Sequence, residues 1–396
     1  MTARTPPPPQ STLFPPEVRR DPYPMYEALR REAPLQFVAG IGRWVVTGHA
    51  ECTAVLRDER FGTSFFASRE EQGVTDGPLM NMLSDWMLFM DPPAHARMRR
   101  LVNRAFTPRA MQRLRPRVQQ LVDGYLDEAA ERGGMDVVTD LAKPLPVVVI
   151  AELLGVDPGL FGNAPVDAGA VLDPVTPPEV IEHLDASVDS YLDEFRAVLR
   201  ARRTDPRDDL MTGLAQVDEL SEDEIVATCT LLFEAGHETT VNLIGNGTLA
   251  LLRNPDQLAR LRGDDSIDEV AIEELLRFDP PVHLTARVAL HDVEVSGKQI
   301  AAGEHVVCLL AAANRDPGVF AEPDRLDVLR QPNPHLSFSA GIHFCLGAAL
   351  ARIEGQIAIG SLVRRFPRIA LAEGGELEWR TTITLRGLTS LPVTLG

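Results

Sequence analysis

The chain has 396 residues, 44% of them hydrophobic and 24% charged, a composition that excludes wholesale disorder and allows a large buried core. Its formal net charge of −18 excludes nucleic acid as an expected partner, because both would be negatively charged. No apolar run has the length or position of a signal peptide or a membrane-spanning helix, so we expect a cytoplasmic protein without membrane insertion.

In chain order, the first 20 residues form a proline-rich leader, which we expect to be flexible, ahead of a single domain over residues 21–396. Residues 21–38 predict a short helix and then a strand, and residues 42–58 a strand leading into a helix. Residues 92–261 are mostly helical with proline breaks, and short strands return after residue 280. Without a repeating strand–helix rhythm, the pattern favours an α+β fold dominated by helix.

The segment "DPPAHARMRRLV" predicts a helix that starts at a proline pair and places His95 and Arg99 on one face. Side chains four residues apart on a helix can both reach a single anionic group. From Arg97 to Arg117 the chain has eight arginines and no acidic residue. This arginine strip is either a solvated helical face or a docking surface for an acidic protein.

The longest predicted helix begins after Ser221, which has capping-box spacing to Glu224, and ends shortly before Pro255. Its centre, "LLFEAGHETT", combines the small residues Ala235 and Gly236 with Glu238, Thr239 and Thr240. A helical threonine can bond the carbonyl one turn back, here that of Ala235, and an acid beside an alcohol can hold water and relay protons. Taken alone, the same residues fit equally well with tight helix packing and a solvated glutamate.

In "EELLR", Glu274 and Arg277 lie three residues apart and can pair on one helical face. By itself this spacing indicates an ordinary surface salt bridge.

The stretch "FSAGIHFCLG" places Cys345 just before a strongly helical run. A lone cysteine is usually a core residue, and the four cysteines of this chain are too scattered to form a zinc or iron–sulfur site. Here Gly341 can adopt a backbone conformation closed to other residues, Gly347 leaves room beside the sulfur, and the helix start favours a thiolate. A single thiolate with open access suits a metal already held by a planar macrocycle, as in thiolate-ligated haem.

Together these segments resemble the bacterial, soluble cytochromes P-450, the haem-thiolate monooxygenases. "FSAGIHFCLG" is similar to the family's cysteine loop, with Ala340 at a position that is often glycine. "AGHETT" is similar to its oxygen-binding groove, "EELLR" to its Glu-x-x-Arg helix, and "ANRDPGVFAEPDRLDVLR" to the meander before the cysteine loop. The resemblance implies the cytochrome P-450 fold, with a long central helix over the haem and small β-sheets.

The resemblance also implies site residues. Cys345 would be the axial ligand of haem b, with Phe338, Gly341 and Gly347 in the loop around it. The residues implied to bind the haem propionates are His95, Arg99, Arg287 and His343. Glu274, Arg277 and Arg325 would form a structural triad, and Arg330 remains an alternative to Arg325.

The resemblance further implies insertion of one oxygen atom from O2 into an apolar small molecule by hydroxylation or epoxidation, in secondary-metabolite biosynthesis. Glu238 and Thr239 would be the catalytic proton-relay pair, and the substrate would arrive free or tethered to a carrier protein. Electrons would come from NAD(P)H through a separate ferredoxin reductase and ferredoxin, and the chain would act as a monomer. The residues expected to line the substrate pocket are Leu83, Leu232, Ala235, Val282, Leu284 and Leu388.

Two alternatives stay open at this point. One is a haem enzyme that uses peroxide, which the Glu238–Thr239 pair disfavours because relatives specialised for peroxide commonly lose it. The other is a catalytically silent haem-binding module that recruits partners.

Overall fold

The computed structural model describes residues 16–396 except 64, 72–75, 164–177 and 375. Residues 1–15 of the predicted leader therefore lie outside the described residues. Residues 16–20, the end of that segment, form a helix, α1 (Pro16–Arg20). The carbonyl oxygen of Arg20 accepts a hydrogen bond of 3.1 Å from Nη2 of Arg386, so a contact holds this end of the chain to the C-terminal region.

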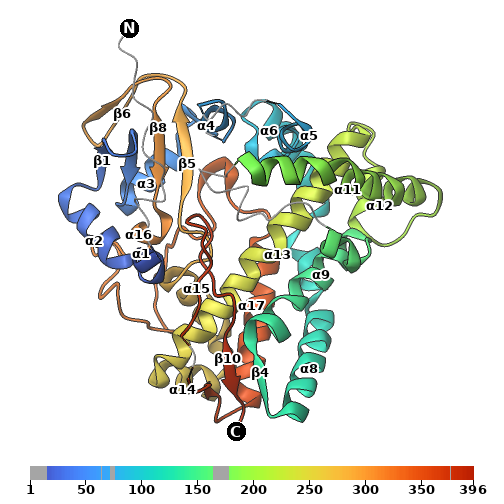
Figure 1. The fold of residues 1–396 in the computed structure, drawn as a ribbon, viewed down its shortest axis with the longest axis vertical. Coiled ribbons are helices and arrows are strands. Elements are labelled where there is room, and N and C mark those ends of the chain that lie inside the picture. The colour runs from blue at the N-terminus through green and yellow to red at the C-terminus, as the bar shows by residue number, and fades with distance from the viewer. Residues whose placement is uncertain (1–15, 64, 72–75, 164–177, 375) are drawn as a thin grey trace.

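The α-helices dominate the described chain (Figure 1). They are α1, α2 (Tyr23–Glu32), α3 (His49–Arg57), α4 (Phe65–Glu71), α5 (Pro78–Ser84), α6 (Ala94–Ala105), α7 (Pro108–Gln112), α8 (Arg115–Arg132), α9 (Pro144–Leu154), α11 (Pro178–Thr204), α12 (Leu210–Ala215), α13 (Glu222–Leu252), α14 (Pro255–Gly263), α15 (Asp268–Phe278), α16 (Leu310–Ala313) and α17 (Ala348–Arg365). Shorter helical turns are η2 (Met87–Phe89), η3 (Val138–Ala142), η4 (Pro158–Asn163), η5 (Asp265–Ile267) and η6 (Gly341–His343).

The strands form small sheets; β1, β5, β6 and β8 lie at one side of the molecule, whereas β4 and β10 lie among the helices near the C-terminus (Figure 1). They are β1 (Leu35–Val38), β2 (Arg43–Val46), β3 (Phe61–Thr63), β4 (Gly134–Asp136), β5 (Thr285–Ala289), β6 (Val293–Val295), β7 (Lys298–Ile300), β8 (His305–Cys308), β9 (Ala370–Leu371) and β10 (Pro392–Thr394). The largest sheet has the order β1-β2-β8-β5-β3, and only the β2–β8 pairing in it is parallel. The other sheets have the orders β4-β10-β9 and β6-β7. The prediction of a helix-dominated α+β fold is confirmed.

Helix α13 crosses the middle of the molecule, as the sequence predicts (Figure 1). Its start has the predicted capping box: the Ser221 hydroxyl accepts from the backbone N–H of Glu224, and the Glu224 carboxylate accepts from that of Ser221. α13 packs against α9, α11 and α17. Most side chains along its length are therefore buried, and not only those on one face. Residues 235–237 and 239 are only half-buried, which leaves the middle of the helix accessible.

No α-helix in the described ranges is long and apolar enough to cross a bilayer. α13 has the length but carries buried acids, among them Glu234 and Glu238.

Candidate functional site

The loop before α17 is held in one conformation by a glycine. Gly341 has φ +72°, and a Cβ atom built on it would lie 2.2 Å from the carbonyl oxygen of Leu56, at the end of α3. Any larger residue would therefore meet both an unfavourable backbone conformation and a backbone collision. The prediction that Gly341 adopts a backbone conformation closed to other residues is confirmed. The loop then turns back, and the backbone N–H of Cys345 donates a hydrogen bond of 3.0 Å to the carbonyl oxygen of Phe338.

Cys345 is the exposed member of the four free cysteines, although protein surrounds it closely. Burial raises the thiol pKa, while the backbone N–H groups of Gly347 and Ala348 and the charges of Arg99 and Arg352 act in the opposite direction. The helix start favours the thiolate as predicted, but in the chain alone this effect does not outweigh burial; binding to a metal ion deprotonates a thiol outright.

Four basic side chains gather beside this loop from three parts of the chain. His95 and Arg99 come from α6, Arg287 from β5 and His343 from η6. The rings of His95 and His343 have centroids 4.3 Å apart, and Nη2 of Arg99 donates a 2.7 Å hydrogen bond to the carbonyl oxygen of Phe344. The structure thus brings together all four residues predicted to bind propionates.

Within the described residues no ion pair joins this basic cluster to an acid, although the charge of Asp91 acts on His95 and Arg287 from nearby. Burial, together with the charges of Arg287, His95 and Arg99, lowers the pKa of His343 to about 3, and its Nε2 is buried without a hydrogen-bond partner. Burial also lowers the pKa of the Arg287 guanidinium. Burial thus disfavours positive charge on these side chains, and an anionic partner would stabilise it. The two carboxylates of a haem beside a thiol ligand fit this arrangement.

Phe338, the first residue of the cysteine loop, packs against a residue that the sequence analysis missed. The guanidinium carbon of Arg352, on α17, lies 4.5 Å from the centre of the Phe338 ring. Arg352 also makes a two-point ion pair with Glu273, with distances of 2.6 and 2.8 Å. Burial opposes ionisation of Glu273, but hydrogen bonds from Arg352 and His335 lower its pKa to about 2. The stacked arginine therefore stays paired and in place at neutral pH.

At the middle of α13, the Thr239 hydroxyl donates a 3.2 Å hydrogen bond to the carbonyl oxygen of Ala235, as predicted. A Cβ atom at Gly236 would lie 3.5 Å from Ile150 of α9, an ordinary contact distance, so packing at this point does not require a glycine. The interpretation of Glu238 as a solvated residue is wrong. Glu238 is 3% exposed and forms an ion pair with Arg380, which the sequence analysis also missed.

The Glu-x-x-Arg pair is buried, and the reading of it as a surface salt bridge is wrong. Both side chains are 0% exposed, and Arg277 makes two hydrogen bonds of 2.7 and 2.8 Å with the Glu274 carboxylate. The assignment of Arg325 as third member is corrected to Arg330, whose Nε lies 3.1 Å from both carboxylate oxygens. The Arg325 side chain is 54% exposed and pairs with Glu322, because its position in the meander directs it outward.

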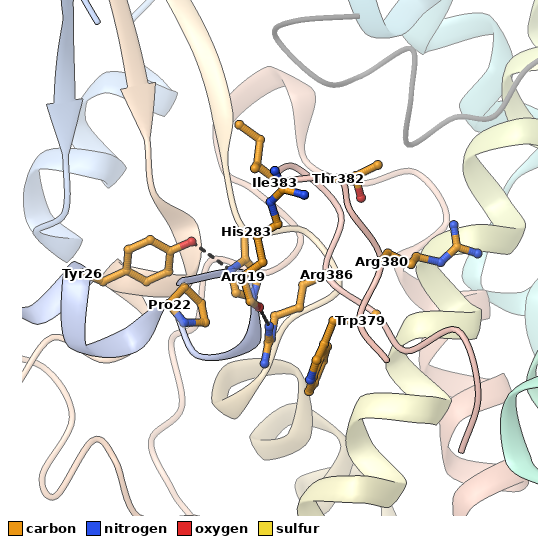
Figure 2. Close-up of a pocket in the computed structure, with 10 residues that line it drawn as sticks. Arg19, Pro22, Tyr26, His283, Trp379, Arg380, Thr382, Ile383 and Arg386 are labelled. Atoms are coloured by element: carbon orange, nitrogen blue, oxygen red, sulfur yellow. Dashed lines mark hydrogen bonds between the residues drawn. The ribbon is translucent and has the colours of Figure 1, made fainter. Parts of the chain in front are cut away.

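The residues predicted to line a substrate pocket are divided among the hydrophobic clusters. Leu83, Leu232 and Leu388 are buried in the main core, and Ala235 packs against it. Leu284 belongs to a small cluster next to the largest sheet, and Val282 packs against a further one. The cavity drawn in Figure 2 lies elsewhere, between α1, α2 and the loop of residues 379–387, here called the C-terminal loop. His283 forms part of its wall.

Several arginines of the arginine strip form contacts within the protein. Arg97 forms an ion pair with Glu224, and Arg117 forms one with Glu152 at 2.7 Å. Arg99 belongs to the basic cluster, whereas Arg100 and Arg113 are exposed. A docking surface for an acidic protein therefore has fewer available charges than the sequence indicates.

A buried acid, Glu354 of α17, also escaped the sequence analysis. It is 1% exposed, is hydrogen-bonded to Thr240, and has one carboxyl oxygen, Oε1, without a partner among the described residues. The available signal was a single acid within the apolar run from Leu350 to Val363. Burial raises its pKa to about 8, so Glu354 is protonated at neutral pH.

Replacing Glu354 by glutamine is expected to flatten the dependence of stability on pH. With a raised pKa, the folded chain binds a proton that the unfolded chain releases above about pH 4.3. The stabilisation by protonated Glu354 is therefore complete below that pH and is lost as the pH rises through about 8. Unfolding midpoints in urea between pH 5 and 9 check this: the wild type should lose more stability than Glu354→Gln, and parallel curves would contradict the assignment.

A family model described as Cytochrome P450 matches residues 178–378. The vitamin D(3) 25-hydroxylase of Pseudonocardia autotrophica is 41% identical over 98% of this chain and 97% of its own. The 6-deoxyerythronolide B hydroxylase of Saccharopolyspora erythraea is 38% identical over 94% of this chain and 96% of its own. Among solved structures, P450BioI in complex with an acyl carrier protein bearing hexadec-9Z-enoic acid has a TM-score of 0.90 at 38% identity, covering 96% of this chain and 100% of that one.

These matches extend over nearly the whole chain, and they agree with a site in which an accessible thiol lies beside a cluster of four basic side chains. The chain belongs to the cytochrome P450 family and is a haem-dependent monooxygenase that uses O2.

Proposed function

We propose that the enzyme inserts one oxygen atom from O2 into an apolar small molecule, by hydroxylation or epoxidation, with electrons from NAD(P)H delivered by a ferredoxin reductase and a ferredoxin. The observation that carries the proposal is the accessible Cys345 thiol beside four basic side chains that form no ion pair within the described residues, with Nε2 of His343 buried and without a hydrogen-bond partner. Cys345 would hold the haem iron, and the basic groups would bind the propionates. When bound, haem supplies the centre at which O2 is reduced.

The protein's own contribution is to position water and protons. The Thr239 hydroxyl lies at the accessible middle of α13, where its bond to the Ala235 carbonyl leaves the oxygen able to accept from a water molecule. Glu238, one residue earlier, is buried and paired with Arg380, so its carboxylate has a defined position. Thr239 would hold water near the reacting oxygen, and Glu238 would pass protons to that water.

Replacing Thr239 by alanine is expected to lower the product formed per NAD(P)H consumed by about tenfold, because proton delivery becomes misdirected. Coupling is measured as the ratio of product to oxidised NAD(P)H. Thr228→Ala is a matched control, because Thr228 makes the same bond to the carbonyl one turn back, at 2.8 Å to Glu224, but far from the middle of α13. Unchanged coupling in Thr239→Ala would remove this role.

The substrate proposed here is bulky and apolar, such as a polyketide or terpenoid. Four of the six predicted pocket residues are leucines and the other two are Ala235 and Val282, so all six are apolar. The two named relatives are hydroxylases of vitamin D(3) and 6-deoxyerythronolide B. The structure of a relative with a loaded acyl carrier protein supports testing tethered substrates as well. The test measures the change in haem spin state on adding vitamin D3, 6-deoxyerythronolide B, and hexadec-9Z-enoic acid either free or bound to its carrier protein. The compounds that change the spin state distinguish free from carrier-tethered substrates.

The alternative of a peroxide-using enzyme makes a different prediction. Product formation with hydrogen peroxide but not with O2 and a reduced ferredoxin would favour it. Normal haem loading without reduction or turnover of any probe would favour a silent binding module instead. The buried, paired Glu238 next to Thr239 supports the O2-dependent reaction, because only that reaction takes up protons in its net stoichiometry.

A further inference from the structure

An ion pair between α15 and α17 lies next to the cysteine loop. These two helices pack against each other (Figure 1). The Arg352 guanidinium donates two hydrogen bonds to the Glu273 carboxylate, of 2.6 Å from Nε and 2.8 Å from Nη2. The two side chains are 31% and 27% exposed, so solvent screens the pair only in part. Because the two groups are joined at two points, the guanidinium has a fixed orientation.

The same guanidinium faces the cysteine loop. Its central carbon lies 4.5 Å from the centre of the Phe338 ring, and the carbonyl oxygen of Phe338 accepts the backbone N–H of Cys345 at 3.0 Å. Of the two charges in the ion pair, that of Arg352 acts more strongly on the Cys345 thiol. The positive end of the ion pair therefore dominates at the sulfur.

His335 supports the position of the Glu273 carboxylate. Nδ1 of His335 accepts a 3.2 Å hydrogen bond from the backbone N–H of Ser337, so Nε2 carries the proton and donates to Glu273 at 3.1 Å. The His335 side chain is 3% exposed, and its ring centre lies 5.9 Å from that of Phe338. The carboxylate is thus held both by α17 and by the segment that leads into the cysteine loop.

Charges near a thiolate-bound iron affect how readily the iron accepts an electron. One electron from a reduced ferredoxin converts ferric to ferrous iron, so the net charge of the iron and its ligands falls by one. A nearby cation stabilises the reduced form and raises the redox potential, whereas a nearby anion lowers it.

We propose that Arg352 and Glu273 set the redox potential of the haem iron: Arg352 holds a positive charge against Phe338 beside the iron's sulfur ligand, and Glu273 keeps the guanidinium in place and offsets part of its charge. Arg352 acts through its charge and through Phe338, and Glu273 acts through Arg352, so both are positioning residues. The proposal rests on Cys345 as the axial ligand in the function proposed above.

The experiment measures the midpoint potential of the purified holoenzyme with redox dyes and without ferredoxin. Arg352→Gln should lower the potential, because Glu273 then remains as an anion without its cation. The ratio of ferrous to ferric protein at a fixed applied potential should fall about tenfold, which corresponds to about 59 mV for one electron. Glu273→Gln should raise the potential, and the double variant should lie between the two. Arg352→Lys keeps the charge and should stay close to the wild type.

A second ion pair between the same helices provides the matched control. Arg364 of α17 makes two hydrogen bonds of 2.9 and 2.7 Å with Asp268 of α15, and its side chain, at 30% exposed, resembles that of Arg352. It lies about 18 Å further along α17 than Arg352. Arg364→Gln and Asp268→Asn therefore remove an equivalent ion pair and should leave the potential unchanged.

Opposite shifts in Arg352→Gln and Glu273→Gln would support the proposal, because a general structural defect would move the potential in one direction only. Shifts of the same sign, no shift, or a shift equal to that of Arg364→Gln would overturn it. An unchanged potential with slower reduction by ferredoxin would also overturn it, and would place Arg352 in a docking surface instead.

The reduced CO complex distinguishes failure of the inference from failure of the proposed function. If the wild type lacks the strongly red-shifted Soret band of thiolate ligation, the assignment of Cys345 fails, and this inference fails with it. A wild type that shows the band, together with variants whose potentials do not shift, refutes the inference alone.

Discussion

Replacing Cys345 by alanine is expected to abolish the strongly red-shifted Soret band of the reduced CO complex and to reduce O2-dependent product formation to background. The band depends on a thiolate bound to the haem iron, and the other cysteines, Cys52, Cys229 and Cys308, are buried elsewhere in the structure. A thiolate ligand also drives cleavage of the O–O bond, so its loss removes the reaction and not only the spectrum. Absorption spectra of the reduced, CO-treated protein check the first expectation.

Cys229→Ala is the matched control for this experiment. Cys229 lies on α13, is 0% exposed, and burial raises its thiol pKa, so it cannot serve as a thiolate. This variant should keep the red-shifted band and lose about 1 kcal/mol of stability at most from the truncated side chain. A Cys345→Ala protein that retains the band would show that the axial ligand has been assigned to the wrong residue.

Replacing Glu274 by alanine is expected to lower the free energy of unfolding by about 3–5 kcal/mol. The substitution leaves Arg277, which is 0% exposed, and Arg330, which is 11% exposed, without their carboxylate. It also removes the acceptor for the backbone N–H of Asp327, which holds the meander to α15 at 2.9 Å. Because domains are stable by about 5–15 kcal/mol, this one change could leave little folded protein. Urea unfolding and the yield of soluble holoenzyme measure the effect.

Arg330→Ala and Arg325→Ala make a milder test that does not depend on recovering Glu274→Ala. Arg330 binds both oxygens of the buried carboxylate, so its loss should cost about 2 kcal/mol or more. The Arg325 side chain is 54% exposed and its partner Glu322 is 70% exposed, so its loss should cost less than about 1 kcal/mol. Equal effects of the two substitutions would contradict the assignment of Arg330 as third member of the triad.

The features predicted correctly are those that depend on neighbouring residues. The capping box of Ser221 and Glu224, the bond from Thr239 to Ala235 and the left-handed conformation of Gly341 all lie within a few residues of chain. The motif resemblance added His95 and His343, whose rings are 4.3 Å apart although 248 positions separate them in sequence. Such long-range proximity follows from the family's shared fold and not from local spacing.

The failures concern side chains whose partners lie far away in the sequence. The alternative of a solvated Glu238 failed because Arg380 pairs with this carboxylate from 142 positions away. The choice between Arg325 and Arg330 could not be made from the meander, since both follow the same turn-rich stretch and only the position of α15 distinguishes them. Nor could the sequence reveal the packing of Arg352 against Phe338.

The amino-acid sequence by itself determined the fold class, the order of the elements and the ligand loop, because helix caps, backbone conformations and a specific cysteine motif are encoded locally. The tertiary structure alone decided which charges are buried and with which partners. That depends on how helices α13, α15 and α17 and the C-terminal loop pack together, and burial changes the energy of an ion pair far more than sequence spacing does.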